Sequence, residues 1–96
     1  MKTYNYHNDP GHGWFAVPRS ELVALGITNQ ISGYSYQKGK TVYLEEDGDA
    51  GTWFKAYEKK HGCKPSYKDK YNDGQHPIRS YPSYDPENPP MFCWIN

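Results

Sequence analysis

The sequence predicts a small α+β domain in which two helices pack on one face of a mostly antiparallel sheet. One segment carries apolar residues at helical spacing (Ala50, Trp53, Phe54 and Tyr57), and others alternate polar with apolar or aromatic residues. Clusters of glycine, proline, asparagine and aspartate separate these segments and mark turns. The expected order is β-β-α-β-β-α-β, followed by an irregular, proline-rich C-terminal tail.

The first part of the chain predicts two strands and a helix. Residues 3–6 and 14–17 are rich in β-favouring side chains, and the Asn-Asp-Pro-Gly turn between them favours a hairpin. Pro18 suits the first turn of a helix, with Ser20 as an alternative N-cap. Gly26 follows the last apolar helix position and fits a C-terminal cap. The apolar helix positions are Leu22, Val23 and Leu25.

The middle of the chain predicts a β-hairpin. Residues 33–37 and 41–45 show the alternation expected of strands, and Lys38 and Gly39 lie between them as a tight turn. Each strand should therefore place one set of side chains toward the core.

A second helix and an edge strand complete the predicted domain. The acidic run from Glu45 to Asp49 suits a helix start, where carboxylates meet unpaired N–H groups and the positive end of the dipole. Gly62 closes that helix after lysines in its last turn. Residues 66–71 alternate tyrosine and aspartate with lysine, which is typical of an exposed edge strand.

The length of the chain, 96 residues, suits one domain. We expect a compact domain over residues 1–72 and a proline- and aromatic-rich tail over residues 73–96, docked on the domain or partly disordered. The five prolines of this tail should preclude regular elements. Its large apolar side chains are costly to expose and should dock on the body or on a partner. These are Ile78, Tyr81, Tyr84, Met91, Phe92 and Trp94.

Composition narrows the function classes. The net charge is zero, which removes a strong electrostatic drive toward nucleic acid or membranes. No apolar run reaches the length of a membrane helix, and the N-terminus lacks an apolar signal region. The two cysteines, Cys63 and Cys93, are too few for a disulfide framework and fit reduced thiols in a cytosol. These features predict a soluble cytoplasmic protein.

Two groups of residues could hold a metal ion. His7, Asp9 and His12 offer suitable ligand types in one loop, although their spacing matches no established zinc motif. The alternative is a tight turn with polar side chains. A second set would combine His61 and Cys63 with His76 or Cys93. No cofactor is predicted otherwise; the alternative is a divalent metal such as zinc.

The acidic run and Cys63 are further candidates for chemistry. Carboxylates at Glu45, Glu46 and Asp47 could bind a cation, act as acid and base, or face basic residues of a partner. Helix capping explains the same residues without a ligand. Cys63 would need a base such as His61, and its place after a helix C-terminus disfavours a thiolate.

Aromatic residues of the hairpin are the candidates for binding. Tyr34, Tyr36 and Tyr43 could stack bases or grip a protein, and Lys38 with Lys40 could contact a phosphate. The alternative is that these tyrosines cover the edge of the core. Trp94 in the tail could add to the same surface.

Three segments carry a resemblance to a known family. Residues 7–14 (HNDPGHGW), 31–36 (ISGYSY) and 42–47 (VYLEED) resemble a family of small uncharacterised proteins encoded by bacteriophages, plasmids and their hosts. The resemblance covers about residues 3–71 and carries no known activity or functional residues. It implies a mobile-element protein, and such proteins often block host defences by binding.

The leading hypothesis is therefore a non-enzymatic phage or mobile-element accessory protein that binds a host macromolecule. A host-defence inhibitor resembling an anti-CRISPR protein is one concrete version. The second hypothesis is a small metal-binding enzyme or sensor that uses the His7/Asp9/His12 loop. The third is a nucleic-acid or nucleotide-binding module that uses the tyrosine face.

Overall fold

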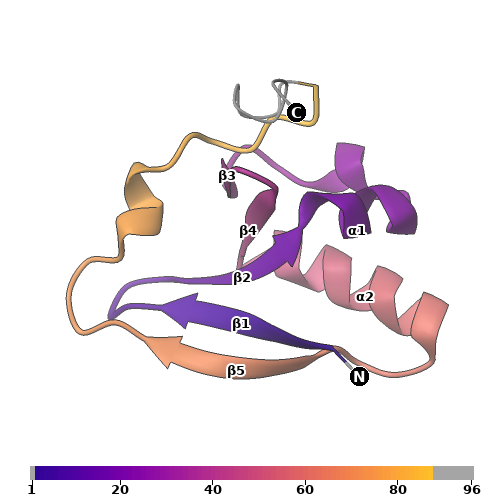
Figure 1. Ribbon diagram of the computed structural model, residues 1–96, viewed down its shortest axis with the longest axis horizontal. Coiled ribbons are helices and arrows are strands. Elements are labelled where there is room, and N and C mark those ends of the chain that lie inside the picture. Colours follow the sequence, from indigo (N-terminus) through magenta and orange to yellow (C-terminus); the bar gives the residue numbers. More distant parts are fainter. Residues whose placement is uncertain (1, 88–96) are drawn as a thin grey trace.

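The computed structural model describes residues 2–87 and shows an α+β fold, as predicted. Five strands form one sheet in the order β3-β4-β2-β1-β5. The two α-helices lie together on one side of this sheet (Figure 1). The elements are β1 (Thr3–Asn8), β2 (Gly13–Pro18), α1 (Arg19–Leu25), η1 (Thr28–Gln30), β3 (Tyr36–Lys38), β4 (Thr41–Glu45), α2 (Asp49–His61), β5 (Ser66–Tyr71) and η2 (Pro77–Ser80).

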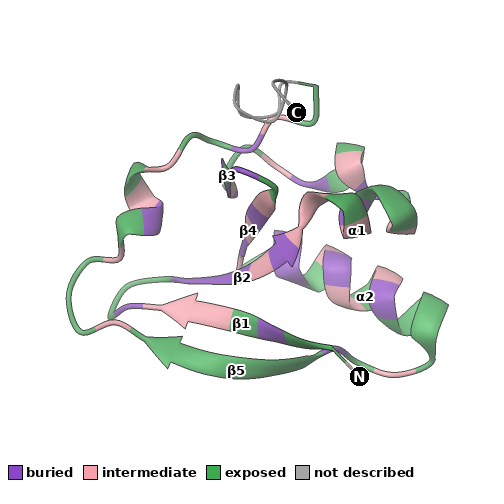
Figure 2. Cartoon of the chain, viewed as in Figure 1, coloured by how far each residue is buried: buried purple, intermediate pink, exposed green. Residues whose placement is uncertain are grey.

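The sheet is mostly antiparallel, with one parallel pair at its edge. β1 and β2 form the predicted hairpin, and β4 joins β2 on its other side. β5 lies at the edge and pairs in parallel with β1, so that Thr3 aligns with Ser66 and Asn8 with Tyr71. All six β5 residues are exposed (Figure 2), as expected for the predicted polar edge strand.

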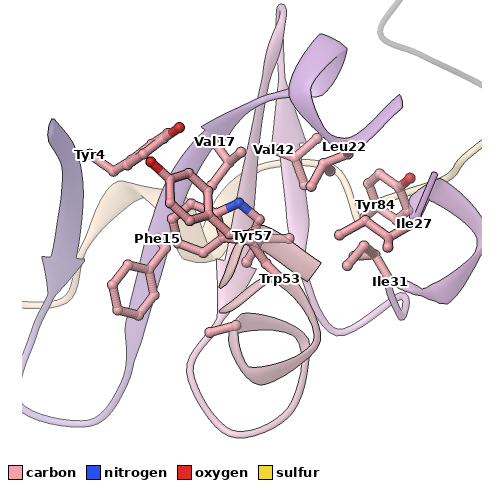
Figure 3. Close-up of a cluster of buried hydrophobic side chains, with 12 residues drawn as sticks. Tyr4, Phe15, Val17, Leu22, Ile27, Ile31, Val42, Trp53, Tyr57 and Tyr84 are labelled. Atoms are coloured by element: carbon pink, nitrogen blue, oxygen red, sulfur yellow. The ribbon is translucent and has the colours of Figure 1, made fainter. Parts of the chain in front are cut away.

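The main core lies between the sheet and the two helices. Alternation along β2 and β4 directs Phe15, Val17, Val42 and Leu44 to this side. Trp53 of α2 is fully buried among aromatic rings (Figure 3). The predicted apolar spacing of α2 is confirmed, because its buried hydrophobic residues share one face. These are Ala50, Trp53 and Tyr57, with Phe54 packed against the same core.

Glycines end both α-helices as the sequence predicts. Gly26 and Gly62 have φ of 71° and 77°, in the left-handed region that favours glycine. Helix α1 begins at Arg19, directly after Pro18, and no side chain caps its start. Ser20 lies inside the helix, so the alternative N-cap is wrong.

The strand predicted over residues 33–37 is wrong in its bounds. β3 comprises only Tyr36–Lys38, because the preceding residues turn toward the start of α2. There the hydroxyls of Ser32 and Ser35 donate to the buried carboxylate of Asp49, over 2.7 and 2.6 Å. The hairpin turn is also one residue later than predicted, at residues 39 and 40, and Gly39 adopts a φ of 62°.

The chain after β5 covers the other face of the sheet. We call residues 76–85 the C-terminal strap. Contrary to the prediction, this proline-rich segment contains a regular element, the 3-10 helix η2, because proline suits its first position. Ile78 of the strap is buried, and Tyr84 reaches the main core around the β3 edge. The predicted docking positions Met91, Phe92 and Trp94 lie outside the described residues.

Backbone hydrogen bonds fix the strap at the β3 edge. The N–H of Gln37 donates to the carbonyl of Pro82, and the N–H of Tyr84 donates to the carbonyl of Ser35. The Tyr84 hydroxyl then donates to the carbonyl of Thr28 over 2.7 Å. The strap therefore covers the edge that β3 would otherwise leave unpaired.

Candidate functional site

Strand alternation builds a polar and aromatic face on the side of the sheet away from the helices. His7, Trp14 and Glu45 align across β1, β2 and β4, and Tyr43 aligns with Tyr36 in the next row. Because side chains alternate along each strand, these residues share one face. The strap and the loop before α2 surround them.

An ion pair between Asp9 and Arg79 anchors the strap to this face. The Asp9 side chain is 1% exposed. Its two oxygens accept from Nε and Nη2 of Arg79 over 2.9 and 2.8 Å. They also accept three backbone N–H groups, from Gly11, His12 and His76. The β1–β2 turn and the start of η2 are therefore held by one carboxylate.

The same contacts determine the chemistry of Asp9. The Arg79 guanidinium, followed by the backbone N–H of His76, holds the pKa of the Asp9 carboxyl well below its usual range. A carboxylate with this many hydrogen-bond donors acts as an internal anchor.

Within residues 2–87, no three His, Cys, Asp or Glu side chains gather as a metal site. The structure thus does not bring His7, Asp9 and His12 together as ligands.

His7 faces the strap on the covered side of the sheet. Its ring lies 5.3 Å from the His76 ring and 6.1 Å from the Tyr43 ring, between centroids. Burial lowers the pKa of His7, and the positive charges of His76 and Lys70 lower it further. His76 is oriented by its own helix, because its Nδ1 accepts from the N–H of Ile78.

This environment predicts a loss of stability in mild acid. The folded protein binds a proton at His7 less readily than the unfolded chain, which protonates this histidine near the usual pKa of about 6.5. Protonation therefore favours the unfolded chain progressively as the pH falls from that value toward the lower folded pKa. His7→Gln should flatten the dependence of urea midpoints between about pH 7 and 5. Equal slopes for the variant and the wild type would contradict this assignment.

An open cavity of about 500 Å³ lies beside the ion pair. Trp14 is buried and lines it, whereas Tyr34 is 81% exposed at the same cavity. The Arg79 guanidinium carbon lies 5.5 Å from the centroid of the Trp14 ring. The lining residues are His12, Trp14, Tyr34, Tyr36, Glu45, Asp47, Gly48 and Arg79.

The start of α2 forms the acidic side of this cavity. The Glu45 carboxylate accepts the backbone N–H groups of Asp47, Gly48 and Asp49 over 2.8–2.9 Å. It therefore caps the helix as the sequence suggested, although from β4 rather than from the cap position. The Asp47 carboxylate is exposed, and no hydrogen bond joins it to another described side chain.

The predicted binding residues do not all lie at this cavity. Tyr34, Tyr36, Glu45 and Asp47 meet at the cavity. Tyr43 instead packs on Tyr81 of the strap, with a centroid distance of 5.4 Å. Lys38 also contacts the strap, and its Nζ lies 4.7 Å from the centroid of the Tyr81 ring. Glu46 accepts from the Tyr6 hydroxyl, and Trp94 lies outside the described residues.

Sequence reasoning missed Trp14 and Arg79 at this cavity. Trp14 had a usable signal, because it alternates with Phe15 and so faces away from the helices. Arg79 had none, since its partner Asp9 lies 70 positions away.

The candidate thiol lies elsewhere. Cys63 is a free, half-buried cysteine packed against the main core after α2. The His61 ring packs against Tyr57 at a tilt, with 4.3 Å between centroids. Cys93 lies outside the described residues.

Among residues 2–87, no helix is both long and apolar enough to cross a bilayer. Searches for a matching protein-family model, a similar curated protein and a similar solved structure find none.

Proposed function

We propose that this chain is a non-enzymatic accessory protein of a bacteriophage or mobile element that binds a host protein in the bacterial cytoplasm. The observation that carries this proposal is the exposed ring of Tyr34 beside a cavity lined by Trp14 and Tyr36. Large aromatic side chains at a hollowed surface are frequent anchors of protein interfaces. The resemblance of the segments at residues 7–14, 31–36 and 42–47 supports the mobile-element origin, and inhibition of a host defence system is its concrete form.

The surface around Tyr34 suits a protein partner better than the surfaces around the other exposed tyrosines. The exposed residues Tyr67 and Tyr71 lie on the edge strand β5, and each is next to a lysine in the sequence. Edge lysines oppose the addition of another strand. Tyr34 lies instead in a loop fixed by the bonds of Ser32 and Ser35 to Asp49, so its backbone is held before a partner arrives.

A capture experiment with matched tyrosine variants tests the proposal. Tagged wild-type protein, Tyr34→Ser and Tyr71→Ser would serve as baits in nuclease-treated bacterial lysates, with recovered proteins quantified by mass spectrometry. We expect one protein to be enriched by the wild type and by Tyr71→Ser. Its recovery with Tyr34→Ser should fall at least about tenfold, as for an interface hot spot.

Two outcomes would contradict the proposal. Equal recovery with Tyr34→Ser would move the interface to another surface. Recovery that disappears on nuclease treatment would favour nucleic-acid binding instead.

A further inference from the structure

The cavity beside Tyr34 combines aromatic walls with carboxylates. Trp14 and Tyr36 are edge-to-face, with 6.2 Å between ring centroids. Glu45 aligns with Trp14 across β2 and β4, so its carboxylate lies on the same face as this ring. Asp47 completes the acidic side. Aromatic faces attract cations, and carboxylates accept hydrogen bonds from them.

The charges around the cavity leave an excess of negative charge. Arg79 lines the cavity, but its charge is balanced by the buried carboxylate of Asp9 in a bidentate ion pair. The positive end of the α2 dipole, equivalent to about half a unit charge, faces the Glu45 carboxylate, which accepts from the N–H of Asp49. The Asp47 carboxylate is exposed and has no hydrogen-bond partner among the described residues.

We infer that this cavity receives an arginine side chain of the partner protein; the inference rests on the proposed function and names the chemistry of its partner. A guanidinium is planar, stacks on aromatic faces and pairs with carboxylates through two parallel hydrogen bonds. The chain already places its own Arg79 guanidinium over the Trp14 ring. An incoming arginine would stack on the exposed ring of Tyr34 and hydrogen-bond to Asp47.

Blocked tripeptides test this inference without knowledge of the partner. Acetyl-Gly-Arg-Gly-amide would be titrated into 15N-labelled full-length protein, beside peptides with citrulline or glutamate in place of arginine. We expect the arginine peptide to shift the Trp14 indole resonance and the amides of Asp47 and Gly48. Citrulline keeps the shape of the side chain but removes its charge, so this peptide should bind at least about fivefold more weakly.

A matched pair of aspartate variants tests whether the Asp47 carboxylate binds the arginine peptide. Asp47→Asn should weaken the arginine peptide about fivefold, near the upper range of an exposed ion pair. Asp73→Asn changes an exposed aspartate outside the cavity lining and should leave binding unchanged.

Several results would overturn the inference. Equal binding of citrulline would make shape, not charge, the determinant, and stronger binding of glutamate would assign the cavity to anions at Arg79 and His12. Resonance shifts at residues away from the cavity would show that the arginine peptide binds at another surface. If the arginine peptide fails while Tyr34-dependent capture succeeds, the binding function stands and only its chemistry is wrong. If the peptide binds but no protein is captured, the arginine site stands and the proposed host-binding function is wrong.

Discussion

Trp53→Ala should lower the free energy of unfolding by about 3–5 kcal/mol, the range for removing a buried aromatic side chain. Trp53 is fully buried, and its ring lies 4.9 Å from Tyr4, 5.3 Å from Phe54 and 5.7 Å from Phe15, between centroids. Small domains are stable by only about 5–15 kcal/mol, so the loss is a large fraction of the total. Urea denaturation followed by circular dichroism would measure it.

Trp53→Phe provides the control for this prediction. The indole nitrogen of Trp53 is buried and has no hydrogen-bond partner among the described residues. Replacing tryptophan by phenylalanine removes this unpaired N–H while keeping a ring in the core, so the loss should be clearly smaller than for alanine. A loss below about 1 kcal/mol for Trp53→Ala itself would show that the ring is not at the centre of the core.

Asp9→Asn should release the C-terminal strap from the sheet. Asparagine keeps the shape of the side chain but removes the charge that Arg79 pairs with and replaces one acceptor oxygen by a donor. We expect the midpoint of thermal unfolding to fall by at least about 4–8 °C. The amides of Gly11, His12 and His76, which donate to Asp9, should exchange hydrogen faster than in the wild type.

Acid should reduce the difference between Asp9→Asn and the wild type. Because the folded pKa of Asp9 is lowered, its contribution is complete above the usual aspartate pKa of about 3.9 and is lost as the pH falls below it. Urea midpoints at about pH 5, 3.5 and 2.5 would show the two proteins converging as the pH falls below the usual aspartate pKa. Asp73→Asn, at an exposed position, should match the wild type in heat stability. A constant difference across the pH series would place the effect of Asp9→Asn outside the ion pair.

Local patterns predicted most of the fold because they depend on neighbouring residues. The spacing of Ala50, Trp53 and Tyr57 indicated the buried face of α2, and Gly26 and Gly62 marked the helix ends through their left-handed backbone. The strand at residues 33–37 was overestimated. Polar and aromatic residues do alternate there, but the hydroxyls of Ser32 and Ser35 donate to Asp49, and the chain turns before β3 begins.

Distant pairs could not be predicted from those patterns. Nothing near Asp9 in the sequence indicates Arg79, and nothing in residues 66–71 indicates a parallel partner at residues 3–8. The candidate site depends on both kinds of information. Tyr34, Tyr36 and the acidic run lie in adjoining segments of the sequence, whereas the cavity also needed Trp14 from β2 and Arg79 from the strap.

The parallel pairing of β1 with β5 determines when the sheet can be completed during protein synthesis. β1 leaves the ribosome before β5, and its outer edge stays unpaired until residues 66–71 have been translated. Contacts between such distant segments slow folding, and an open strand edge exposes a nascent chain to wrong partners. The sheet is therefore completed only after β5 has been translated and pairs with a strand made long before it.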